Sequence, residues 1–198
     1  MRTYTIPKIS GEIDWTTIPV IPIDQILWSE DVGIRAQGQV CYQGDTLYLH
    51  QSAVEKEIRA EYTEPLSPVY EDSCLEFFFM QEGDQGYFNF EINPNGCIIA
   101  EYGSSGADRT GIVISDPVGF FEIKTDRTSD GWEVFYRIPL TLIQPYAPGF
   151  QFNGKLAANM YKCGDKTAHR HFLSWNPIDL EHPNFHCPRF FGTMNFGS

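Results

Sequence analysis

The stretch "EDSCLEFFFMQEGDQGYFNFEIN", residues 71–93, has the pattern of two β-strands joined by a short polar turn. Successive side chains of a strand point to opposite faces of its sheet, so every second residue shares a face. In the first strand one face carries Leu75, Phe77 and Phe79, and the other carries Cys74, Glu76, Phe78 and Met80. In the second strand one face is apolar, with Phe88, Phe90 and Ile92, and the other is a polar row of Tyr87, Asn89, Glu91 and Asn93.

The register of this pair decides which polar side chains meet. If "QEGDQG" closes a symmetric hairpin, Glu76 lies opposite Glu91 and Phe78 lies opposite Asn89. Two opposed carboxylates are unfavourable unless a cation, a shared proton or a hydroxyl-rich ligand lies between them. The polar row is therefore a candidate binding site, and a solvated sheet face is the alternative.

The remaining sequence predicts an all-β fold. Short β-branched and aromatic runs bounded by Gly, Pro, Asn and Asp recur along the chain, and helical periodicity is nearly absent. Strands are expected at residues 34–42, 46–51, 53–62, 75–80, 87–93, 97–102, 120–126, 132–138, 155–162 and 172–175. The turns "QGDT", "NPNG" and "SDGW" predict tight antiparallel connections, and "PLTLIQPY" predicts one short helical turn.

The organisation of the chain predicts a single domain over residues 1–198, because no repeat, linker or low-complexity tract divides it. About ten short strands at this spacing predict an antiparallel β-sandwich of two packed sheets, of the jelly-roll or immunoglobulin-like kind. A barrel is the alternative architecture.

Composition limits the partners of the protein. With 42% hydrophobic and 15% aromatic residues the chain can build a substantial core. A net charge of -12, with the 14 basic residues in no cluster, argues against nucleic acid. No segment approaches the roughly 18 continuous apolar residues of a membrane helix. The start "MRTYTIPKIS" lacks an apolar signal region, so a cytoplasmic location is expected, or secretion if a leader has been removed.

Cysteine and histidine usage gives no strong metal signature. Five cysteines without a CxxC pair favour free, mostly buried thiols over a disulfide framework or a zinc ribbon. His169 and His171 form an HxH pair, and His182, His186 and Cys187 follow shortly after. Imidazoles two residues apart on a strand can chelate zinc or copper, but exposed histidines before a strand are the favoured interpretation.

The C-terminal stretch "SWNPIDLEHPNFHCPRFFGTMNF", residues 174–196, is too rich in proline for a central strand and predicts a structured loop followed by a last strand. Phe185 lies between two prolines in this loop, where a large ring either packs down as a plug or is displayed as a platform. Trp175 is interpreted as a core or pocket-wall residue, and it is the third aromatic residue of the candidate site.

Several stretches together resemble the family 9 carbohydrate-binding modules and the related DOMON sandwiches. They are "SGEID" (10–14), "YEDSCLEFFF" (70–79), "YFNFEINPNG" (87–96), "DGWEVFYRIPL" (130–140) and the C-terminal stretch of residues 174–196. They cover nearly the whole chain in the order of the family. The resemblance implies a β-sandwich that holds a sugar between two aromatic rings, with acidic and amide side chains around its edge.

Carried over position by position, the resemblance places the two rings at Tyr70 and Phe185, where the characterised modules have tryptophan. It assigns Glu76 as an acceptor of sugar hydroxyls, and Asn89 stands where those modules have a basic residue. Together with Glu91, these residues predict non-catalytic binding of a mono- or disaccharide or of a polysaccharide chain end. Flat rings cover the C–H faces of a sugar, while carboxylates and amides satisfy the hydroxyls at its rim.

Three alternatives stay open at this point. A structural or interaction module with a non-sugar ligand is favoured modestly by the missing tryptophans. A glycoside hydrolase with Glu76 and Glu91 as acid and base would use the same carboxylate pair. The family also resembles calcium-binding sandwiches, so a structural Ca²⁺ is a further alternative, although the scattered acids assign no ligand set.

Overall fold

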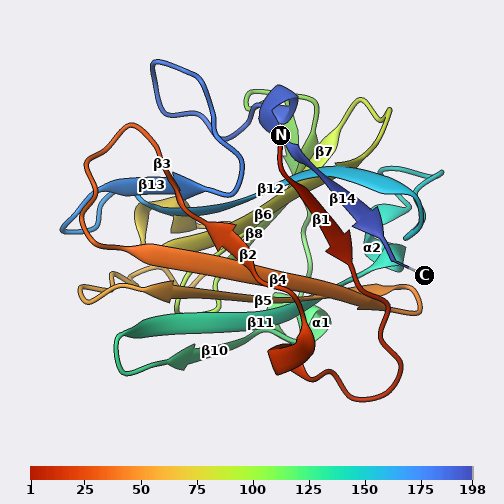
Figure 1. Ribbon diagram of the computed structural model, residues 1–198, viewed down its shortest axis with the longest axis horizontal. Helices are drawn as coiled ribbons and strands as arrows, with labels where there is room; N and C mark the ends of the chain where they lie inside the picture. The colour runs from red at the N-terminus through yellow and green to blue at the C-terminus, as the bar shows by residue number, and fades with distance from the viewer. Residues whose placement is uncertain (198) are drawn as a thin grey trace.

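The two aromatic strands lie in the middle of the larger of two facing sheets in the computed structural model, which describes residues 1–197 (Figure 1). The order of this nine-stranded sheet is β1 (Thr3–Ile6), β14 (Gly192–Phe196), β12 (Lys155–Gly164), β6 (Cys74–Gln81), β7 (Tyr87–Ile92), β8 (Ile98–Gly103) and β9 (Arg109–Gly111). Beside β12 the sheet also contains β13 (His171–Ser174), which pairs in turn with β3 (Gln25–Ile26).

The smaller sheet has five strands, in the order β10 (Lys124–Arg127), β11 (Gly131–Pro139), β5 (Thr46–Val54), β4 (Arg35–Gln43) and β2 (Ile21–Ile23). The helical segments are α1 (Pro117–Phe121), α2 (Leu140–Ile143) and three 3₁₀ turns, η1 (Trp15–Thr17), η2 (Val69–Glu71) and η3 (Pro188–Phe190). None of these helices, which lie in residues 1–197, has the length and apolar composition of a membrane span. The two-sheet sandwich is confirmed, as are the last strand and the helical turn after Pro139.

Strand pairing confirms the register expected for the central hairpin. Glu76 pairs with Glu91 and Phe78 pairs with Asn89 between β6 and β7. On the other side of β6, Glu76 pairs with Tyr161 of β12. The polar row of β7 is therefore continued on the same face of the larger sheet by Glu76 of β6 and Tyr161 of β12.

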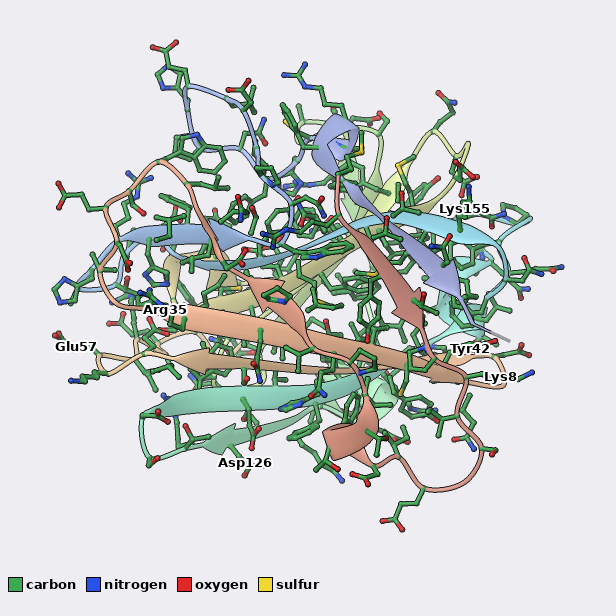
Figure 2. The ribbon with its side chains drawn as sticks, viewed as in Figure 1. Lys8, Arg35, Tyr42, Glu57, Asp126 and Lys155 are labelled. Carbon is green, nitrogen blue, oxygen red and sulfur yellow. The ribbon has the colours of Figure 1, made fainter. Side chains whose placement is uncertain are left out.

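The inner faces of the two sheets form the main core. Phe77, Phe79, Phe88 and Phe90 are at most 1% exposed, and the rings of Phe79 and Phe90 stack with their centroids 5.9 Å apart. Full burial of each such side chain stabilises the fold by about 1.5–3 kcal/mol. Figure 2 shows side chains filling the space between the sheets, with labelled charged residues at the periphery, namely Lys8, Arg35, Glu57, Asp126 and Lys155.

A second apolar cluster covers the outer face of the larger sheet. It contains Phe78, Tyr87, Tyr161, Phe172 and Phe185 together with Val69 of η2. Two long loops, residues 55–73 and 175–191, supply its outer half. In Figure 1 the blue loop before β14 rises above the larger sheet, on the side away from the smaller sheet. The face that carries the polar row is therefore roofed by loops rather than by a third layer.

Two of the predicted strands are wrong, one in its existence and one in its start. The strand expected at 53–62 does not form, because β5 continues through Val54 and residues 55–62 then leave the sheet as a loop. The strand expected at 120–126 begins only at Lys124. Asp116 caps the preceding helix α1 by accepting a hydrogen bond from the Gly119 amide at 3.0 Å, and Pro117 opens the helix. An Asp-Pro pair is a helix-start signal that outweighed the apolar run.

A buried ion pair connects the two sheets at one end of the sandwich. Lys162 of β12 is fully buried, and its Nζ lies 3.1 Å from Oε2 of Glu55, the residue that follows β5. Glu55 also accepts hydrogen bonds from Ser73 Oγ at 2.9 Å and from Trp132 Nε1 at 3.3 Å. The contact with Ser73 ties this pair to the end of the 55–73 loop, just before β6.

Candidate functional site

A cleft of about 460 Å³ opens between the two roofing loops on the outer face of the larger sheet. Its floor is formed by side chains of β6, β7, β8 and β12, namely Glu76, Glu91, Ile99 and Cys163. Its aromatic lining comes from the loops and from β13, and consists of Trp28, Tyr70, Phe172 and Phe185. The structure therefore brings four of the six predicted site residues together at one cleft: Tyr70, Glu76, Glu91 and Phe185.

Tyr70 is presented on the 3₁₀ turn η2 and is 42% exposed. Its carbonyl oxygen accepts a hydrogen bond from the Asp165 amide at 3.1 Å, and Val69 beside it is fully buried. Asp72 holds the incoming loop, because its Oδ2 accepts hydrogen bonds from the amides of Glu61 and Tyr62 at 2.9 and 3.0 Å. The backbone of Tyr70 is thus fixed on both sides while its ring remains free.

Phe185 is both packed and displayed. Its ring stacks on Tyr161 with a centroid distance of 4.1 Å and an interplanar angle of 8°, and the Tyr161 hydroxyl donates to the Phe185 carbonyl at 3.2 Å. The side chain is 9% exposed and reaches the cleft beside Trp28, whose ring centroid lies 5.8 Å away. One face of Phe185 is therefore already covered by the protein.

The two opposed carboxylates are almost completely buried at the cleft floor. Glu76 is 2% exposed and Glu91 is 3% exposed. Burial, followed by the negative charge of Glu101, raises the pKa of Glu91 to about 7. Burial, followed by the Cys163 thiol and Glu91, raises the pKa of Glu76 well above its ordinary value. The pair holds protons that ordinary glutamates release, so its oxygens can both donate and accept hydrogen bonds near neutral pH.

Asn89 lies under the floor rather than in the cleft. It is fully buried, and its Nδ2 donates to Glu91 Oε1 at 3.0 Å and to Glu101 Oε2 at 3.1 Å. A basic group is nevertheless present, because Arg109 of β9 lines the cleft and its Nε lies 2.9 Å from Glu101 Oε2. Asn89 therefore orients two carboxylates. The positive charge that is absent at position 89 is supplied to the cleft by Arg109.

Trp175 is not at the cleft. Its side chain is 3% exposed and belongs to the core between the two sheets. Trp28 lines the cleft instead, on a backbone with a φ of 48°, and its indole N–H donates to the Leu180 carbonyl at 2.6 Å. A left-handed backbone is rare for a residue with a large side chain and is often found at binding sites. Sequence reasoning assigned neither Trp28 nor Arg109 to the site, because no local pattern connects them with residues 70–93.

The histidine pair does not converge on a common point. His171 is buried with its Nδ1 2.7 Å from the carbonyl oxygen of His169 and its Nε2 2.7 Å from Lys162 Nζ. The side chain of His169 is 57% exposed and lies 3.3 Å from Glu57. Asp72, an acid of the kind that Ca²⁺ requires, lies 3.2 Å from the Arg59 guanidinium. The histidine pair and Asp72 are thus already occupied by protein partners. All five cysteines are free, as expected.

A model of the family described as carbohydrate-binding family 9 matches residues 8–196. No curated protein sequence gives a significant match. Among solved structures, a candidate carbohydrate-binding protein from Bacteroides uniformis ATCC 8492 is 29% identical to this chain, with a TM-score of 0.87 and 99% of each chain covered.

Two more distant structures share the sandwich fold. A family 9 module from Caldicellulosiruptor kristjanssonii in complex with glucose is 15% identical, with a TM-score of 0.69 over 99% of this chain and 96% of the module. A family 9 module from the same organism in complex with cellotriose is 13% identical, with a TM-score of 0.67 over 98% and 93% of the two chains. The resemblance and the fold expected from the sequence are both confirmed.

Proposed function

The chain belongs to carbohydrate-binding family 9, and on that premise we propose that its cleft binds a small saccharide or a polysaccharide chain end without cleaving it. The observation that carries the proposal is the meeting of exposed aromatic surface and buried carboxylates in one cleft of about 460 Å³. This volume lies within the range of about 300–1,000 Å³ that is usual for small-molecule sites. A sugar needs both kinds of surface, because its faces are apolar and its rim is hydroxylated.

The apolar contact would come mainly from Tyr70 and Trp28. Tyr70 is 42% exposed and lines the cleft, whereas Phe185 has one face on Tyr161 and supports the wall. Trp28 packs edge-on against Phe172, with ring centroids 5.8 Å apart. Rings held in this way can cover a sugar face without losing much conformational entropy on binding. Trp28 would thus compensate for the tryptophans absent at positions 70 and 185.

The hydroxyl contacts would come from Glu76 and Glu91 as donors or acceptors, from Asp165 as an acceptor and from Arg109 as a donor, all of which line the cleft. Hydrogen bonds to charged groups are stronger than neutral ones, and each buried group left unsatisfied costs about 1–3 kcal/mol. A ligand with several hydroxyls is therefore favoured over an apolar ligand of similar size.

Binding is favoured over hydrolysis by the placement of the two glutamates. Acid and base flank the scissile bond in glycoside hydrolases. Glu76 and Glu91 are instead 2% and 3% exposed at the cleft floor, so a bound sugar would lie above both carboxylates and not between them. The exposed Tyr70 at a formed cleft also favours sugar binding over a purely structural module.

The proposal is tested by isothermal titration calorimetry with glucose, cellobiose, cellotriose and xylobiose. We expect saturable heat for at least one of these sugars. Tyr70→Ala and Trp28→Ala should each weaken binding tenfold or more, which is about 1.4 kcal/mol. Tyr48→Ala is the matched control, because Tyr48 lies on β5 in the smaller sheet, outside the cleft. Folded protein that gives no heat with any sugar would contradict the proposal.

A further inference from the structure

A second constellation lies at the floor of the cleft, where the start of β6 meets the end of β12. Cys74 pairs with Cys163 across the two strands, and Glu76 is two residues further along β6, on the same face. The two Sγ atoms and a carboxylate oxygen of Glu76 all lie within 4.8 Å of one another. The three side chains are 0–2% exposed. In residues 1–197 this is the only group of three such ligands with that spacing.

The carboxylates at this place have no cation of their own. Within residues 1–197, Lys162 pairs with Glu55 at 3.1 Å and Arg109 pairs with Glu101 at 2.9 Å, and no basic side chain forms an ion pair with Glu76 or Glu91. Glu76 Oε1 instead accepts a hydrogen bond from Cys163 Sγ at 2.9 Å. No protein cation competes for these oxygens, and a cation that binds the folded chain alone would stabilise it.

We propose that Cys74, Glu76 and Cys163 form a binding site for a thiophilic divalent cation, with Zn²⁺ as the expected occupant. Two thiolates and a carboxylate belong to the ligand types that Zn²⁺ takes, whereas Ca²⁺ and Mg²⁺ require oxygen ligands. Tetrahedral Zn²⁺ holds its ligand atoms about 3.3–3.8 Å apart. In the structure Cys163 Sγ lies 2.9 Å from Glu76 Oε1 and all three atoms lie within 4.8 Å of one another, distances that bracket this spacing.

Three protein ligands leave a fourth position for water or a ligand hydroxyl. Glu76 and Cys163 line the cleft, so this position faces the cleft, which is also the entry path for the metal. On binding, the two thiols, and Glu76 where it is protonated, release their protons to solvent. Two thiolates and one carboxylate carry three negative charges, which Zn²⁺ reduces to one. The site does not require sugar binding, so either activity can fail without the other.

The test is a titration of the full chain with Co²⁺ after treatment with a chelator and a phosphine reductant. We expect one Co²⁺ per chain, with a near-ultraviolet thiolate-to-cobalt absorption band that Zn²⁺ abolishes by displacement. Cys74→Ser and Cys163→Ser should each abolish this band. Glu76→Gln removes one of three protein ligands, so it should weaken binding by at least the roughly tenfold that the loss of an outer-shell partner already costs a metal site. Cys41→Ser is the matched control, because Cys41 is a buried thiol of β4 in the other sheet.

Two results would overturn the proposal. One is metal binding without a thiolate band, which would indicate surface histidines such as His169. The other is a band that persists in both cysteine variants. If a cysteine variant does not fold by circular dichroism, X-ray absorption at the zinc edge of the wild-type protein decides the matter. Two sulfur ligands support the site, and a shell of nitrogen and oxygen alone refutes it.

Discussion

Lys162 connects the two sheets from a fully buried position, and its loss should be among the most costly single changes in the protein. The ammonium donates to the Cys163 carbonyl at 2.9 Å, lies 2.7 Å from His171 Nε2 and pairs with Glu55 at 3.1 Å. The substitution Lys162→Met keeps an apolar chain of similar length and removes the charge. Glu55 then remains buried with its charge uncompensated.

The expected magnitude follows from the partners that remain. Breaking a buried ion pair by removal of one partner costs about 3–5 kcal/mol. Glu55 keeps hydrogen bonds from Ser73 and Trp132, so we expect a loss near the lower limit, about 3 kcal/mol. In the double variant Lys162→Met/Glu55→Gln the uncompensated charge is absent and both donors still find an acceptor. This variant should recover more than half of the loss.

The assay is urea unfolding followed by tryptophan fluorescence at pH 7, with the free energy of unfolding extrapolated to water. Lys155→Met is the matched control, because Lys155 lies exposed on the same strand β12 (Figure 2), and it should change stability by no more than about 0.5 kcal/mol. A double variant no more stable than Lys162→Met would refute the reasoning, since lost packing rather than the unpaired charge would then explain the effect.

Three further changes test other parts of the structure. Burial, followed by the charge of Lys162, lowers the pKa of His171 to about 4 from an ordinary 6.5. The unfolded chain therefore binds the proton first, and about 3 kcal/mol of stability should be lost as pH falls from 6.5 to 4. Urea titrations at several pH values should show this loss, and His171→Gln should flatten the dependence of the unfolding free energy on pH. In Gly131→Ala the new Cβ would lie 1.8 Å from the carbonyl oxygen of Ala53. Strand β11 must then shift relative to β5, at a cost of about 1–3 kcal/mol, and an unchanged melting temperature would contradict this clash. Asn89→Asp would place another buried acid beside Glu91 and should lower stability by about 3 kcal/mol or more at pH 8, with a smaller loss at pH 5. An equal loss of stability at both pH values would contradict the charge explanation.

The central hairpin shows how far local pattern could predict this structure. Alternation of side chains assigned the faces of β6 and β7, and a symmetric turn predicted the pairing of Glu76 with Glu91, which is confirmed. Both rules depend on neighbours along the chain, so they need no knowledge of the rest of the fold. The same kind of rule gave the wrong result at residues 120–126, where a helix start at Asp116 and Pro117 competes with an apolar run.

The sequence alone therefore determined the class of the fold, the register of the central strands and the family, because strand alternation, turn residues and ordered motifs are local. Only the tertiary structure decided that Trp28 and Arg109 complete the cleft and that Trp175 is withdrawn into the core. It alone also placed Cys163 beside Glu76. These partners come from segments far apart in the chain, and the packing of sheets and loops, rather than any periodicity, sets the distances between them.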